Sequence, residues 1–162
     1  MPDRRPRLVV IGVGNEYRRD DGFGPFVITE LERLRQSDDA PRAVDLRCCD
    51  GEPTRLIDLW TGADLAVVVD VARADANRAG EWFELVLPGA DRLPDEMAVS
   101  SHGIGLGSTA ELAQALGRLP GRLVVLAAIG RDFGFGVGLS RPLAAAVHPV
   151  AGRVRHWLGT RV

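Results

Sequence analysis

The fold is decided by residues 9–24, which read Val9-Val10-Ile11-Gly12-Val13-Gly14-Asn15-Glu16-Tyr17-Arg18-Arg19-Asp20-Asp21-Gly22-Phe23-Gly24. The continuous apolar run over residues 8–11 is typical of a strand that is covered on both faces. It leads into a glycine-rich loop with three acids and an asparagine, and a helix begins at Gly22. Open α/β sheets usually place their chemistry at the end of such a strand. The loop therefore predicts a site for a cation or for a polar group of a substrate.

Strands and helices alternate along the rest of the chain. Further strands are predicted over residues 44–49, 65–71, 81–87 and 122–129, and helices over residues 22–35, 53–60, 108–116 and 141–158. This alternation predicts a three-layer α/β/α sandwich. The linker over residues 72–80 is too short for a crossover helix, so the strand at 81–87 is not expected to be a parallel neighbour of the strand before it. Its mixed polar and apolar pattern suits an edge strand.

The helix starts carry capping residues. We expect Asp20 or Asp21 to cap the first helix and Ser140 to cap the last, which has Pro142 in its first turn. The sequence Ser108-Thr109-Ala110-Glu111 has the form of a capping box, so we expect the third helix to open there.

Composition excludes several classes of protein. The chain has 162 residues and is 46% hydrophobic, which predicts one domain with a sizeable core. It has no apolar run long enough for a membrane span or a signal peptide, so we expect a cytoplasmic protein without a membrane partner. The net charge is −2 and the basic residues are scattered, so no nucleic-acid partner is expected. All 20 basic residues are arginine, which excludes lysine Schiff bases and P-loop lysines.

Three polar residues stand in apolar surroundings and form the candidate site: Asp21, Asp70 and His102. Asp70 ends a valine run, where a carboxylate is costly to bury unless it is paired or binds a metal. The first and third strands are commonly neighbours in such sheets, so Asp21 and Asp70 are expected to converge. Two carboxylates and an imidazole suit a divalent metal, although this set does not choose among zinc, nickel, manganese and iron. Each residue also has a structural alternative, as a helix cap, a hydrogen-bond acceptor or a packed histidine.

Other candidates are weaker. Position 17 is tyrosine, so the dinucleotide fingerprint fails, and there is no GxSxG motif. Asp20 lies beside Asp21, and repulsion between the two carboxylates would raise the pKa of one of them. The alternative, which we expect, is that Asp20 is a solvated side chain. Phe133 and Phe135 line a peptide groove or pack in the core. The adjacent cysteines Cys48 and Cys49 are expected to be structural, one buried and one outward. The histidines His148 and His156 on the last helix are expected to be surface or packing residues.

Taken together, these motifs resemble the hydrogenase maturation proteases. The resemblance lies in Gly-x-Gly-Asn followed by Asp-Asp-Gly-x-Gly, in the apolar strand that ends at Asp70, and in Ser-His-x-x-x-Leu at Ser101 to Leu106. The turn Gly138-Leu139-Ser140 before the last helix also fits. The match covers nearly the whole chain in order and length.

The resemblance implies a single hydrogenase maturation protease domain over residues 1–162. Its fold would be phosphorylase/hydrolase-like, with a five-stranded, mostly parallel mixed sheet in which strand four is antiparallel. The implied activity is an endopeptidase that removes the C-terminal extension of the nickel–iron hydrogenase large-subunit precursor after nickel insertion. The nickel would be carried by the substrate and recognised by Asp21, Asp70 and His102. How the peptide bond is attacked stays open among metal polarisation, metal-activated water and a general-base aspartate.

Two other functions compete with this one. A non-cleaving, metal-dependent binding or chaperone module for a metalloenzyme precursor would use the same ligands, and a product of reduced mass separates it from a protease. A peptidyl-tRNA hydrolase-like enzyme also begins with Gly-x-Gly-Asn. That enzyme requires a histidine soon after the first loop and a basic surface for tRNA, whereas the first histidine here is His102.

Overall fold

The computed structural model describes residues 4–37, 43–89 and 105–159. Its strands are β1 (Leu8–Val13), β2 (Val44–Cys49), β3 (Leu65–Arg73), β4 (Trp82–Leu87) and β5 (Arg122–Gly130). Its α-helices are α1 (Phe23–Ser37), α2 (Pro53–Trp60), α3 (Leu106–Ala115) and α4 (Arg141–Gly159). Two 3-10 turns, η1 (Arg19–Gly22) and η2 (Ala76–Arg78), follow β1 and β3.

The strands form one five-stranded sheet in the order β2-β1-β3-β5-β4. β1 pairs in parallel with β2 and β3, and β3 pairs in parallel with β5. β4 lies at the edge and runs antiparallel to β5. The mixed sheet and the edge position of β4 are thus as predicted, because η2 and its short flanking loops do not provide a crossover helix.

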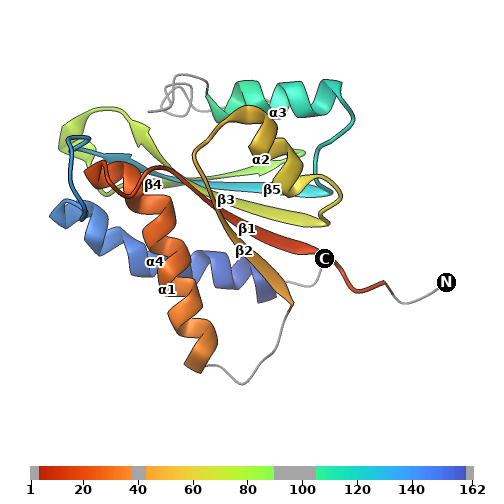
Figure 1. Cartoon of the computed structure of the whole chain (residues 1–162), viewed down its shortest axis with the longest axis horizontal. Coiled ribbons are helices and arrows are strands. Elements are labelled where there is room, and N and C mark those ends of the chain that lie inside the picture. Colours follow the sequence, from red (N-terminus) through yellow and green to blue (C-terminus); the bar gives the residue numbers. More distant parts are fainter. Residues whose placement is uncertain (1–3, 38–42, 90–104, 160–162) are drawn as a thin grey trace.

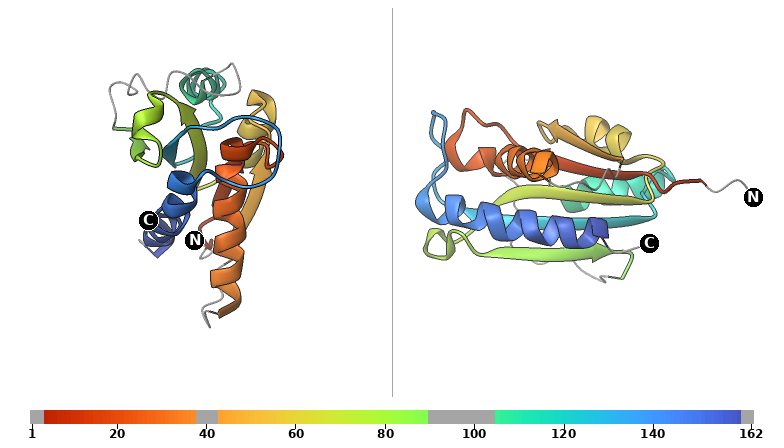
Figure 2. Two further views of the ribbon diagram at one scale, coloured as in Figure 1. Left: turned by 90° about the vertical axis from the view of Figure 1, so that its left-hand side faces the viewer. Right: turned by 90° about the horizontal axis from the view of Figure 1, so that it is seen from below.

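Helices cover both faces of the sheet, α1 and α4 on one and α2 and α3 on the other (Figures 1 and 2). Side chains alternate between the faces along each strand, so the core falls into two clusters. The strand residues buried beneath α1 and α4 include Val10, Val67, Val69, Val124 and Leu126. Those beneath α2 and α3 include Val9, Ile11, Val68, Leu123 and Val125. The predicted three-layer α/β/α sandwich is confirmed. Among the described helices, none has both the length and the apolar character needed to cross a bilayer.

Two predicted helix starts are wrong. The first helix begins at Phe23, after the turn η1 that contains Asp20 and Asp21, so neither residue is its cap. The third helix begins at Leu106, with Gly105 in the N-cap position, so the predicted capping box lies inside the helix. The earlier start has a packing reason, since it places Leu106 on the buried face of the helix, where α3 packs against the sheet.

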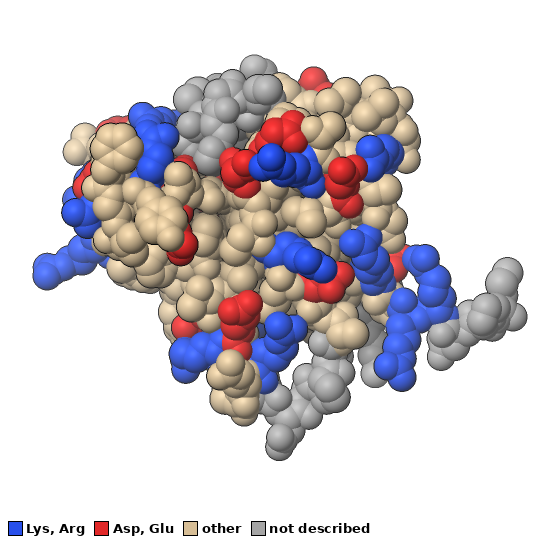
Figure 3. Space-filling model, viewed as in Figure 1, with Lys and Arg blue, Asp and Glu red and all other residues tan. Residues whose placement is uncertain are grey.

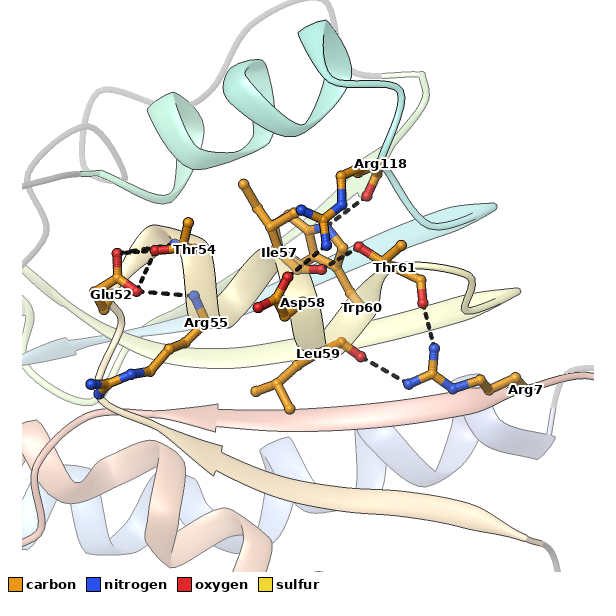
Figure 4. Close-up of polar contacts among 10 residues, drawn as sticks. All are labelled: Arg7, Glu52, Thr54, Arg55, Ile57, Asp58, Leu59, Trp60, Thr61 and Arg118. Atoms are coloured by element: carbon orange, nitrogen blue, oxygen red, sulfur yellow. Dashed lines mark hydrogen bonds and ion pairs between the residues drawn. The ribbon is translucent and has the colours of Figure 1, made fainter.

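Helix α2 shows how a surface helix is fixed over the sheet (Figure 4). The Glu52 carboxylate accepts hydrogen bonds from the backbone N–H groups of Thr54 and Arg55 and so caps the helix start. At the other end Trp60 is fully buried, and its Nε1 donates to the carbonyl of Arg118 at 3.0 Å. The Arg7 guanidinium donates to two carbonyls at the helix end, which tie α2 to the start of β1.

The charged surface is mixed in sign on the face shown in Figure 3, where basic and acidic side chains often lie together. Two of the recorded ion pairs are Arg118 with Asp58 and Arg55 with Asp50. Exposed pairs of this kind contribute about 0–1 kcal/mol each, so the buried core rather than the surface charge stabilises the fold.

Candidate functional site

The site is built on the loop that follows β1. Gly14 has a φ of 141°, and a side chain there would collide with the backbone oxygen of Asp21. This close approach lets the loop fold back, so that the Asn15 N–H donates to Asp21 Oδ2 at 3.0 Å. The Asp21 N–H in turn donates to the carbonyl of Arg18. The first loop therefore fixes both the backbone and the carboxylate of Asp21.

Helix α1 approaches the strands closely just after this loop. A Cβ on Gly24 would lie within 2.6 Å of the Val13 backbone and of the Val69 carbonyl oxygen. Only glycine allows the helix to pack so near the ends of β1 and β3. The glycine-rich pattern thus brings the start of α1, and Asp21 just before it, to the end of β3.

Asp70 lies near the carboxyl end of β3, in register with Ala127 of β5. Asp70 is only 7% exposed, and its Oδ1 accepts a hydrogen bond from the Val71 N–H at 2.7 Å. Burial raises the pKa of Asp70 to about 7. The Val71 hydrogen bond acts in the opposite direction, and the negative charge of Asp21 adds to the rise. A carboxyl group with such a pKa is typical of functional sites.

The structure brings Asp21 and Asp70 together, as the pairing of β1 with β3 and the effect of one charge on the other both indicate. His102 lies outside the described residues. Within residues 4–37, 43–89 and 105–159, no three His, Cys, Asp or Glu side chains are grouped to hold a metal ion. The described part of the site is therefore a buried pair of carboxyl groups at the end of two neighbouring strands.

Asp20 is the site residue that sequence reasoning misjudged. It is fully buried rather than solvated, and it accepts hydrogen bonds from the backbone of Arg131, Asp132 and Ser140 and from the Ser140 hydroxyl. Burial alone would raise the pKa of Asp20, but these hydrogen bonds outweigh it and lower the pKa below its ordinary value. The predicted alternative, a raised pKa from repulsion between the adjacent acids, is therefore not found at Asp20.

The loop over residues 131–140, which follows β5, lies against the loop after β1. The Arg19 N–H donates to the carbonyl of Gly136, and the Gly136 N–H donates to the carbonyl of Tyr17. Three apolar side chains on the paired loops are exposed: Tyr17 (64%), Phe135 (92%) and Val137 (59%). Phe133 instead packs against the core, with the Arg73 guanidinium 4.1 Å from its ring centre. Of the two phenylalanines, one is thus a packing residue and the other faces solvent.

The remaining candidates are structural, as predicted. Cys48 is exposed and Cys49 is buried, and both are free thiols. Burial raises the pKa of both thiols, which makes them poor nucleophiles at neutral pH. His148 lies exposed on α4, with its Nδ1 3.5 Å from Glu30 of α1. His156 is also exposed on α4.

Comparison with known proteins gives a consistent set of structural relatives. No protein-family model matches the chain, and no curated protein is significantly similar to it. Among solved structures, the hydrogenase 2 maturation peptidase of a Thaumarchaeota archaeon is 29% identical, with a TM-score of 0.64 over 96% of this chain and 99% of that one. The hydrogenase maturating endopeptidase HybD of E. coli is 22% identical, with a TM-score of 0.72 over 94% of this chain and 91% of that one.

A third relative is the [NiFe] hydrogenase maturation protease HycI of Thermococcus kodakarensis KOD1. It is 22% identical, with a TM-score of 0.65 over 98% of this chain and 96% of that one. The similarity to these structures spans nearly the whole chain, so the resemblance indicated by the sequence motifs is confirmed. The relative that is 29% identical is named as a maturation peptidase, which supports the predicted peptidase.

Proposed function

We propose that this protein is an endopeptidase that removes a C-terminal extension from the large-subunit precursor of a nickel–iron hydrogenase. The observation that carries the proposal is the buried carboxyl pair Asp21 and Asp70, at the end of β1 and β3 in a fold shared with maturation endopeptidases. Both residues fall in the motifs that resemble that family, and His102 is the third residue of the proposed site.

We further propose that the substrate's nickel is recognised by Asp21, Asp70 and His102. Two oxygen donors and one imidazole form a donor set that accepts several divalent transition metals. Burial, and to a smaller extent the charge of Asp21, raises the pKa of Asp70, and a bound cation would offset both effects by favouring the ionised carboxylate. Nickel held jointly by precursor and protease would restrict binding to the metal-loaded precursor.

The surface beside the carboxyl pair suits a protein substrate. Tyr17, Phe135 and Val137 project from the paired loops, and a group of exposed apolar side chains is a common feature of protein-binding surfaces. For the chemical step we infer attack by water rather than by a covalent nucleophile. The raised pKa of each cysteine thiol argues against thiolate attack, whereas an aspartate carboxylate at the site can accept a proton from water.

The experiment that tests the proposal compares nickel-loaded and nickel-free precursor. Each is incubated with the purified protein, and the mass of the large subunit is measured by mass spectrometry. Loss of a C-terminal peptide from the nickel-loaded form alone is the expected result. A nickel-loaded precursor that binds the protein but keeps its full mass would instead support a non-cleaving binding module.

A further inference from the structure

One buried carboxylate joins the two loops at the site. Asp20 Oδ2 accepts hydrogen bonds from the N–H groups of Arg131 and Asp132, at 2.8 and 2.9 Å, and from the Ser140 hydroxyl at 2.8 Å. Its Oδ1 accepts from the Ser140 N–H at 2.7 Å. The Asp20 N–H donates back to the carbonyl of Asp132. The side chain thus holds the loop over residues 131–140 at both of its ends.

These contacts require an ionised carboxylate. All four donors are N–H or O–H groups that point at its two oxygens, and hydrogen bonds to a charged acceptor are stronger than those between neutral groups. An asparagine at this position would carry an NH₂ group in place of one carboxylate oxygen. One or more of the four donors would then have no acceptor. The Asp20 carboxylate can be buried because N–H and O–H groups of the loop, rather than water, compensate its charge.

Asp20 is also the direct neighbour of Asp21 within η1. Asp21 is held from one side by the first loop, through the hydrogen bond from Asn15 and the close approach of Gly14. Asp20 holds the same turn from the other side, against the loop that follows β5. The turn is therefore fixed between two loops that are more than 100 residues apart in the chain.

We propose that Asp20 is a positioning residue: it sets the orientation of the Asp21 carboxylate by fixing η1 against the loop over residues 131–140. This role rests on the proposed function only in so far as Asp21 takes part in processing. The effect on Asp21 itself is structural and can be measured without substrate.

The first test is amide hydrogen exchange of the whole protein, followed by NMR, in Asp20→Asn. The Asn15 N–H reports on Asp21, since it donates to that carboxylate. We expect exchange at Asn15, Arg131 and Ser140 to be about 10- to 100-fold faster, which corresponds to loss of charge-assisted hydrogen bonds. Exchange in the centre of β3 should not change. Asp132→Asn is the matched control, because the Asp132 side chain accepts from Gly134 while its N–H still donates to Asp20.

Ser140→Ala provides the same test if Asp20→Asn does not fold. It removes one of the four hydrogen bonds and keeps the backbone donors, so a smaller increase is expected in the same amides. The proposal is overturned if the Asn15 amide keeps its wild-type exchange rate and chemical shift in a folded variant whose 131–140 loop amides have become faster.

The second test is the rate of precursor processing. A misplaced Asp21 should lower kcat by about 100-fold in Asp20→Asn while KM stays within about twofold, since orientation rather than binding is lost. An unchanged kcat would overturn the positioning role. If the wild-type protein itself fails to process the precursor, the proposed function fails, and the Asn15 measurement still decides the role of Asp20.

Discussion

Asp70 lies one residue beyond Val69, whose partner across the β1–β3 pair is Gly12, and its pKa is raised first by burial and further by the negative charge of Asp21. One acid from β3 and one from the turn η1 after β1 thus lie together at the carboxyl end of the parallel strands, where α/β proteins place their ligands. The pair is costly in the absence of a cation, because burial and like charge both disfavour a second negative charge.

The stability of the metal-free protein should reflect this cost. Because the pKa of Asp70 is raised from 3.8 to about 7, the native state holds a proton that the unfolded state has already lost between those pH values. The contribution of this proton to the free energy of unfolding is complete below pH 4 and is lost as the pH rises through 7. The loss is on the order of 4 kcal/mol at most.

Urea unfolding of the wild type and of Asp70→Asn in the presence of a chelator measures this contribution. Between pH 5 and pH 8 the free energy of unfolding should fall more steeply in the wild type than in the variant. Equal pH dependence in the two proteins would mean that Asp70 titrates normally.

A matched pair of glycine substitutions tests the close packing of α1 behind the site. Gly24→Ala places a Cβ within 2.6 Å of backbone atoms of β1 and β3, which cannot move away freely. We expect it to lower the free energy of unfolding by about 1–3 kcal/mol or more.

Gly152→Ala in α4 is the control, because a Cβ there meets nothing within 4 Å. It should stabilise the helix by up to about 1 kcal/mol. Chemical denaturation of both variants gives the two values, and similar effects of the two substitutions would show that α1 is not packed as closely as described.

The exposed aromatic side chain of Phe135 should contribute to binding of the precursor and not to folding. Phe135→Ala is expected to raise KM for processing by about 10-fold, in keeping with the loss of one aromatic contact in a protein interface, and to leave the thermal midpoint unchanged. Leu116→Ala, also exposed but in the segment after α3, serves as the control and should change neither quantity. Equal KM values for the two variants would remove Phe135 from the binding surface.

Much of the fold could be predicted because its signals are local. The bounds of β2 and α2 were predicted without error, since an alternating apolar and charged segment marks the strand and a proline after a turn marks the helix. β3 and β5 extend one or two residues beyond their apolar runs, because they pair with each other as far as Arg73 and Gly130. The start of α3 was misplaced because burial of Leu106 outweighed a capping pattern that occurs by chance inside the helix.

The site could be predicted only in part. The convergence of Asp21 with Asp70 follows from a common strand order, so sequence reasoning reached it. The burial of Asp20 could not be predicted, because its partners lie 111 to 120 residues away. Its four donors are three backbone N–H groups and one hydroxyl, in a loop without a distinctive pattern. The one available signal was that the loops after β1 and β5 leave the same edge of the sheet.

Processing of nickel-loaded precursor by Asp70→Asn tests the central claim most directly. The control is Asp75→Asn, which changes an exposed carboxylate five residues further along that only caps η2. Intact mass after incubation should show a shortened large subunit with the wild type and with Asp75→Asn, and processing at least about 100-fold slower with Asp70→Asn. A folded Asp70→Asn protein that shortens the precursor at the wild-type rate would contradict the assignment of the carboxyl pair as the processing site.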